Sequence, residues 1–228
     1  MTGDTSLYLL IAMAFALGIR HGFDLDHLAT IDAITRHVKT HHRLARWTGF
    51  LFSLGHGLVV IVISAVVGGG LVRMHAPLWL EAFGNWVSII CLLIFGSLTL
   101  WNIWPHSSML PVGFKSYLFQ KLAGKSFNPW FIAATGALFA FSFDTFTQVA
   151  LFSMSASVTA NTLFSIMLGM VFMLGMIAAD GCNGVIVSMF IRLADQRSCL
   201  VSRIIGLLIA GFSLVLGLNG LVGQLVVS

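Results

Sequence analysis

The chain consists largely of apolar runs, each long enough to cross a lipid bilayer as a helix. About 20 predominantly apolar residues are needed for one crossing. Six such runs occur, approximately at Leu7–Ile34, Trp47–Val72, Trp79–Trp104, Pro129–Val158, Leu163–Ile191 and Ile204–Val227. Only 9% of the residues are charged, whereas soluble domains carry about 25%. The sequence therefore predicts an all-α, polytopic transmembrane helical bundle of about six spans, built as one domain over residues 1–228 in a lipid bilayer.

The basic residues predict the orientation of this bundle. Of the twelve Lys and Arg residues, ten lie after the first, third and fifth runs. They are Arg36, Lys39, Arg43, Arg46, Lys115, Lys121, Lys125, Arg192, Arg197 and Arg203. Because cytoplasmic loops are enriched in Lys and Arg, we expect these connections in the cytoplasm, both termini outside, and a location in the cytoplasmic (inner) membrane. The net charge of +4 then reports orientation, and no nucleic-acid partner is expected.

The first run is unusual because it holds a dense group of ionisable residues. Gly18 to Arg36 reads GIRHGFDLDHLATIDAITR, although an ionisable side chain inside a membrane costs about 2.5–3.5 kcal/mol even on the mild insertion scale. A helix of this length, roughly 28 residues at about 1.5 Å each, also exceeds a hydrocarbon core of about 30 Å. Either the helix continues into the cytoplasm, or it breaks near Gly22. A break at membrane depth is tolerated only beside protein or a cavity.

Four residues of this group, His21, Asp24, Asp26 and His27, are candidate metal ligands. Imidazole suits nickel, copper and zinc, and carboxylates extend the ligand set. On a regular helix Arg20, Asp24 and His27 share one face, with His21 at its edge and Asp26 pointing away. Asp26 therefore either serves another neighbour or is gathered to the others by an unwound loop. Arg20 and Asp24 also have the spacing of a structural i, i+4 ion pair.

Later runs contribute His56, Asp144 and Asp180, each of which could alone be an interhelical polar contact. If all four intramembrane aspartates converge, Arg20 cancels one of their charges. A divalent cation would then leave the site near −1, whereas an empty site would carry −3 and attract protons. Proton-coupled transport is one consequence.

Two short matches allow an inverted repeat of three plus three spans. Phe23–Asp24 recurs as Phe143–Asp144, and the Leu-Gly pair before His56 recurs, at the same offset, before Met176. Three runs separate the copies, so the two halves would have opposite topology. Inverted repeats with a site near their interface are a common transporter plan.

Four stretches resemble the motifs of the nickel/cobalt transporter (NiCoT) permeases. RHGFDLDHLATIDAITR resembles the family signature of His, four residues and Asp-His, matched here by His21, Asp26 and His27. FSLGHGLVV resembles the Leu-Gly-His motif and contributes His56. FSFDTFTQVALF resembles the Phe-Asp-Thr motif, which contains Asp144 and Thr145, and GMIAADGCNG resembles the fourth motif, which contains Asp180. The motifs occur in family order.

The resemblance implies a secondary permease, not an enzyme, that takes up Ni²⁺ or Co²⁺ as substrate and carries no prosthetic group. Gln148 stands where the family usually has Glu, and Asn183 where it has Asp, so the metal preference and the coupling are in question. The family plan has eight spans, with the His-Asp motif in the second, so the first span is expected to be missing here. No nucleotide-binding GxxxxGK[ST] motif occurs.

Three alternatives stay open. The stretch HVKTHH has the HxxxHH spacing of membrane di-iron hydroxylases, with His37, His41 and His42 as the histidines. The chain could also be a sensor or a subunit of a larger permease complex, or an exporter with the same fold. Glycine spacings permit close helix contacts within or between chains, so the oligomeric state stays open as well.

Overall fold

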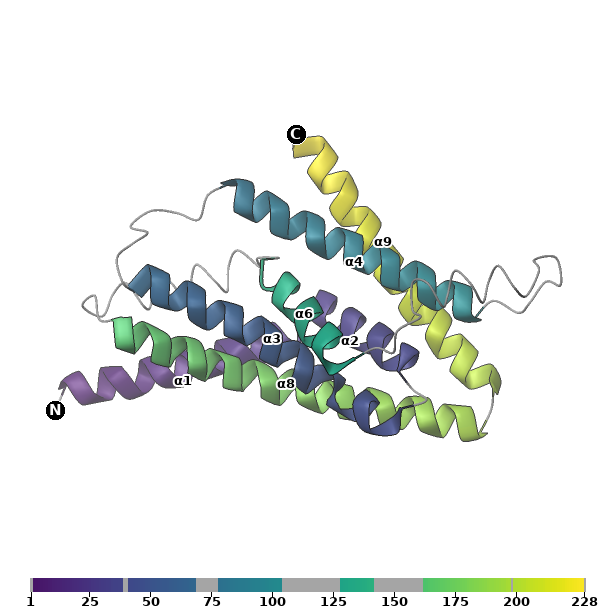
Figure 1. Ribbon diagram of the computed structural model, residues 1–228, viewed down its shortest axis with the longest axis horizontal. Coiled ribbons are helices and arrows are strands. Elements are labelled where there is room, and N and C mark those ends of the chain that lie inside the picture. Colours follow the sequence, from purple (N-terminus) through teal and green to yellow (C-terminus); the bar gives the residue numbers. More distant parts are fainter. Residues whose placement is uncertain are drawn as a thin grey trace.

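A computed structural model describes residues 2–38, 41–68, 78–103, 128–141, 162–197 and 199–227. In these ranges all regular secondary structure is helical (Figure 1). The helices are α1 (Thr2–Gly22), α2 (Leu25–His37), α3 (His42–Gly68), α4 (Leu78–Ile103), α6 (Pro129–Phe139), α8 (Thr162–Arg197) and α9 (Cys199–Val227). The predicted all-α class is confirmed.

Several of these helices are long and apolar enough to cross a bilayer. His42–Val66, Thr162–Leu193 and Gly206–Gln224 each meet that requirement, and Leu7–Gly22 with Leu25–His37 meets it as a bent pair. Among the described residues this gives three spans, or four if the bent pair forms one. The helical membrane bundle is thus supported, while the count of six spans and the inverted repeat stay predictions. The second copy of the repeat, Phe143–Asp144, lies outside the described residues.

The first predicted span is broken near Gly22, which is one of the two alternatives that its length left open. Its two helical segments meet at a bend of 55°. The amide of Asp24 bonds the carbonyl of His21 at 3.0 Å and closes the end of α1. Glycine is needed here because a Cβ atom on Gly22 would lie 2.7 Å from the Cβ of Ala179 in α8. The bend therefore occurs at a close contact between α1 and α8.

The fourth predicted span begins at Pro129, as expected, but its helix ends at Phe139. Eleven residues extend only about 16 Å at 1.5 Å per residue, so α6 cannot cross a bilayer alone. Helix α6 therefore covers only the first part of this predicted span. Phe139 is fully buried and its ring contacts Phe52 of α3, so the helix ends against the interior of the bundle. Residues 142–158 lie outside the described part.

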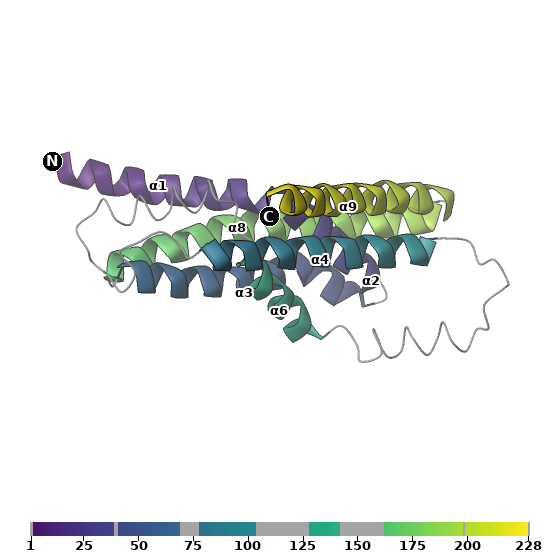
Figure 2. The ribbon, with the colours of Figure 1, turned by 90° about the horizontal axis from the view of Figure 1, so that it is seen from above.

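The long helices α1, α8 and α3 lie side by side, in that order, in both views (Figures 1 and 2). Ala14, Val60 and Phe172 belong to a hydrophobic cluster that joins these three helices. A second cluster, including Ile31, Phe52 and Phe139, joins α2, α3 and α6. Helix α2 is buried from Ala29 to Thr35, as expected for a helix packed on all sides. Helices α4 and α9 pack on each other beside it.

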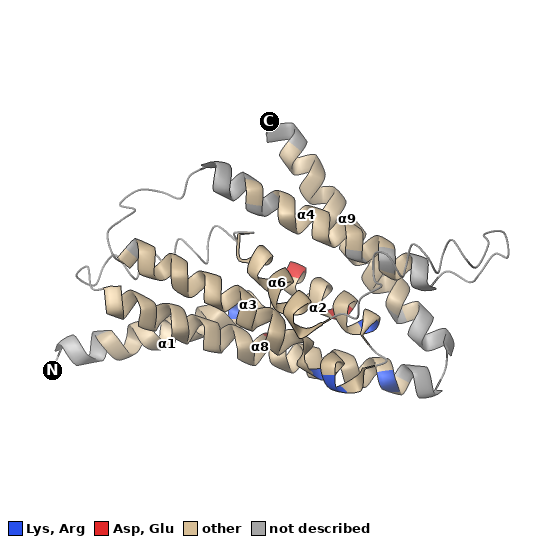
Figure 3. Ribbon diagram, viewed as in Figure 1, with Lys and Arg blue, Asp and Glu red and all other residues tan. Residues whose placement is uncertain are grey.

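The basic residues of the described chain are mostly at one end of the bundle. The basic residues drawn in blue lie where α2 ends, where α3 begins and toward the end of α8, apart from one near the middle (Figure 3). This arrangement agrees with basic residues in alternate connections. Asp32 and Arg36, expected to be neighbours, form a two-bond ion pair with a Nε–Oδ2 distance of 2.8 Å. That pair neutralises the only carboxylate in the middle of α2.

Candidate metal centre

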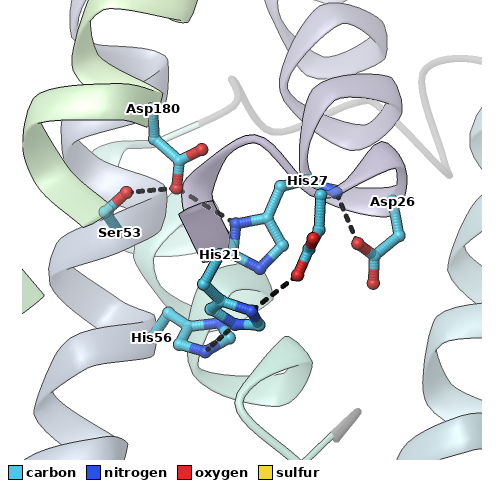
Figure 4. Close-up of polar contacts among 7 residues, drawn as sticks. His21, Asp26, His27, Ser53, His56 and Asp180 are labelled. Atoms are coloured by element: carbon cyan, nitrogen blue, oxygen red, sulfur yellow. Dashed lines mark hydrogen bonds and ion pairs between the residues drawn. The ribbon is translucent and has the colours of Figure 1, made fainter. Parts of the chain in front are cut away.

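Three histidines from three helices converge in the interior of the bundle (Figure 4). His21 lies in the last turn of α1, His27 in the first turn of α2, and His56 in the middle of α3. Each offers one ring nitrogen, and these atoms all lie within 4.8 Å of one another. The Nε2 atoms of His21 and His56 are 3.3 Å apart. All three side chains are buried, with exposed fractions of 3%, 1% and 0%.

The bend between α1 and α2 is what brings His21 and His27 together. On one continuous helix, six residues of separation would place them about 120° apart around the axis. In the bent pair their ring centroids are 4.7 Å apart. His56 completes the group, at 5.1 Å from His21 and 4.9 Å from His27 by the same measure. We call these residues the imidazole cluster.

Two carboxylates orient two of the imidazoles. Nδ1 of His21 donates to Oδ2 of Asp24 at 2.8 Å, and Nδ1 of His27 donates to Oδ2 of Asp180 at 3.1 Å. Because an ionised carboxylate only accepts hydrogen bonds, the Nδ1 atoms carry the protons. The Nε2 atoms therefore present lone pairs, as in the carboxylate–histidine pairs of metal sites.

Asp24 and Asp26 take different roles at the start of α2. Asp24 is the N-cap residue, but its side chain makes no capping bond because it accepts the bond from His21. Asp26 instead accepts the backbone amide of His27 at 2.9 Å, satisfying one of the free amides of a helix N-terminus. Of the two alternatives for Asp26, the structure shows a separate neighbour. Its carboxylate lies on the side of His27 away from Asp180 (Figure 4).

The other residues expected at the site are distributed more widely. Asp180 is fully buried and bound to His27. Asn183, one turn further along α8, is half-buried, and its amide nitrogen makes no hydrogen bond within the described chain. Arg20 is exposed on α1. The remaining three residues, Asp144, Thr145 and Gln148, lie outside the described residues.

Apolar side chains surround the imidazole cluster on two sides. The ring of His21 lies 5.6 Å from that of Phe172, and the ring of His27 lies 5.0 Å from that of Phe52, between centroids. These phenylalanines belong to the two hydrophobic clusters of the bundle. In such a medium, charge interactions are stronger than in water. Nδ1 of His56 and Oδ1 of Asp180 are nevertheless buried and unpartnered among the described residues, as expected of groups arranged for a ligand.

Sequence reasoning missed one polar residue of the site, Ser53. Its hydroxyl donates to Oδ2 of Asp180 at 2.5 Å, so this oxygen accepts bonds from both Ser53 and His27. A signal for it existed, because Ser53 belongs to the FSLGHGLVV stretch and lies three residues before His56. Residues with that spacing lie on the same side of a helix.

The histidines of the HVKTHH stretch do not form a second centre in the described part of the chain. His41 and His42 are exposed, and Nδ1 of His37 bonds the carbonyl of Ala33 at 2.8 Å. The imidazole cluster is the one group of three or more metal-ligating residues that the described ranges contain. The hydroxylase alternative therefore receives no support from the structure.

Fold and site together define a helical membrane protein with a buried cluster of three imidazoles between its helices, a group of the kind that can hold a metal ion. The chain belongs to the NicO family of high-affinity nickel-transport proteins, whose profile matches residues 7–199. The resemblance drawn from the four motifs is thus confirmed. No solved structure matches this chain.

Curated relatives support the same family. The high-affinity nickel-transport protein NixA of Helicobacter pylori is 29% identical over 212 residues, which cover 81% of this chain and 64% of the relative. The hydrogenase nickel incorporation protein HupN of Bradyrhizobium diazoefficiens is 29% identical, covering 65% and 45%. The cobalt transport protein NhlF of Rhodococcus rhodochrous is 27% identical, covering 68% and 51%. The chain therefore spans less than two thirds of the length of these relatives.

Proposed function

We propose that this chain is a secondary transporter that takes up Ni²⁺ or Co²⁺ across the cytoplasmic membrane, with His21, His27 and His56 as metal ligands. The observation that carries the proposal is the buried imidazole cluster, in which two rings are held by carboxylates with Nε2 facing inward. Imidazole nitrogen suits nickel and other borderline divalent metals. The names of the relatives, which include nickel and cobalt transport, point to the same substrates.

Charge balance favours a divalent ion at this position. The carboxylates of Asp24 and Asp180, each bonded to an imidazole, together carry two negative charges. A divalent cation among the three ring nitrogens would balance them, whereas leaving the fully buried charge of Asp180 uncompensated is costly. Asp26 and Asp144 remain candidate ligands, with Arg20, Thr145, Gln148 and Asn183 in supporting positions.

The remaining features of the proposal follow from the sequence. Basic connections in the cytoplasm would leave both termini outside, and no prosthetic group or enzymatic activity is required. The three nitrogen ligands of the cluster suit transport, because an ion in transit must be released and a closed cage would retain it.

Reconstitution tests the proposal directly. Purified wild-type protein in liposomes is expected to carry Ni²⁺ or Co²⁺ into the lumen, measured with an enclosed metal-sensitive dye. Protein-free liposomes and external chelator serve as controls. Transport by the single polypeptide would also exclude an obligate partner subunit. If neither metal enters with protein present, the proposal is wrong.

The carboxylate partners are expected to tune metal affinity. Asp24→Asn replaces the charged acceptor of His21 with a neutral one, so the imidazole becomes a poorer ligand. Loss of such an outer hydrogen-bond partner typically costs about 10- to 100-fold in metal affinity or activity. We expect the Ni²⁺ concentration for half-maximal transport to rise about tenfold, measured in the same liposomes. An unchanged value would show that Asp24 does not act on the metal through His21.

A further inference from the structure

Ser53 differs from three other buried hydroxyl residues of the helices. Thr35, Thr48 and Thr135 each donate to the backbone carbonyl four residues earlier, the usual local bond of a helical hydroxyl. Ser53 instead donates across the interface between α3 and α8 to Oδ2 of Asp180. Both side chains are fully buried, so this bond is made away from water.

The backbones of α3 and α8 come unusually close beside this bond. A Cβ atom on Gly49 would overlap the carbonyl oxygen of Asp180, and one on Gly184 would lie 2.8 Å from the amide nitrogen of Gly49. Gly49 and Ser53 are four residues apart and therefore share one face of α3. The close crossing brings the short Ser53 side chain within reach of Asp180.

The bond from Ser53 constrains the carboxylate of Asp180, which has few other hydrogen-bond partners. Oδ2 of Asp180 accepts bonds from Ser53 and His27, while its Oδ1 has no hydrogen-bond partner in the part of the chain that the structure describes. The serine hydroxyl therefore holds the rotation of the carboxylate, and the carboxylate holds Nδ1 of His27. Three helices, α3, α8 and α2, are joined by this relay (Figure 4).

We propose that Ser53 is a positioning residue for metal binding: through Asp180 it fixes the orientation of His27, so that Nε2 is the nitrogen offered to the ion. This inference rests on the proposed function. It assigns the transported ion to the Nε2 side of His27 and gives Ser53 an effect on the metal without contact with it.

A double-mutant cycle on metal affinity tests the relay. Purified Ser53→Ala, Asp180→Asn and the double variant are titrated with Co²⁺, whose visible absorption reports ligand geometry. We expect Ser53→Ala to weaken Co²⁺ binding about tenfold and to change the absorption spectrum. Because Ser53 acts through Asp180, the double variant should bind no more weakly than Asp180→Asn alone. Additive losses would overturn the relay.

Ser64→Ala is the matched control. Ser64 lies on the same helix, is also fully buried and also packs on α8, beside Gly169, but its hydroxyl makes no hydrogen bond within the described residues. It should bind Co²⁺ like the wild type. If Ser53→Ala matches Ser64→Ala in affinity and spectrum, the positioning role is wrong while the metal site stands. If the wild type itself binds no Co²⁺, the proposed function fails instead.

Discussion

Cells that produce His21→Ala are expected to accumulate no more ⁶³Ni than cells without the protein. The substitution removes one of three converging nitrogens and leaves the carboxylate of Asp24, which had bonded His21, without that donor. Two imidazoles cannot replace three around an ion stripped of water, so the loss should exceed the roughly 10- to 100-fold typical of an outer partner. The amount of protein in the membrane, measured by immunoblot, should be unchanged. Normal uptake would contradict the assignment of His21.

His41→Ala provides the control for this experiment. His41 is exposed and outside the imidazole cluster, so its loss should leave uptake at the wild-type level. The same variant tests the hydroxylase alternative, which requires His41 as an iron ligand. Loss of function in His41→Ala with normal uptake in His21→Ala would favour that alternative.

Gly49→Val is expected to prevent assembly of the bundle. Even the first carbon of a side chain at this position would overlap the carbonyl oxygen of Asp180, and a helix backbone cannot rotate away as a flexible side chain can. Helices α3 and α8 would have to separate, which disrupts both the Ser53–Asp180 bond and the packing beside it. The destabilisation should exceed the roughly 1–3 kcal/mol of ordinary overpacking. Size-exclusion chromatography in detergent should show aggregated protein.

Gly181→Ala is the matched control for helix α8. Gly181 follows Asp180 directly, but a Cβ atom there would meet nothing within 4 Å. This variant should elute and transport like the wild type, and could be slightly more stable because alanine favours helices over glycine. If Gly49→Val elutes as a monodisperse protein that melts like Gly181→Ala, the close crossing is not required for the fold.

The sequence was informative where ionisable residues occur inside the apolar, membrane-spanning runs. The length of the first run gave a break near Gly22 as one of two alternatives, and the bend occurs there. His21, His27 and His56 were candidate ligands, and they converge. The reasoning succeeds because an imidazole inside an apolar run is costly unless it has a partner or a task, so its position alone carries information.

Other features depended on contacts that no local pattern reveals. Ser53 is inconspicuous in a helix, and its role comes from Asp180, 127 residues away in sequence. Asp26 has the same side chain as Asp24, yet only the geometry of the helix start assigns it to the amide of His27. The apolar run from Pro129 to Val158 likewise could not indicate that α6 ends at Phe139, whose ring packs against Phe52.

The bend of 55° between α1 and α2 has a consequence for how an ion would leave. His21 and His27 belong to separate rigid segments, so straightening or twisting the junction would pull their nitrogens apart. An ion held by both would resist that movement, and by linkage a force that straightens the junction would weaken the hold on the ion to the same extent. Metal occupancy and the angle between α1 and α2 would then be coupled in a single equilibrium.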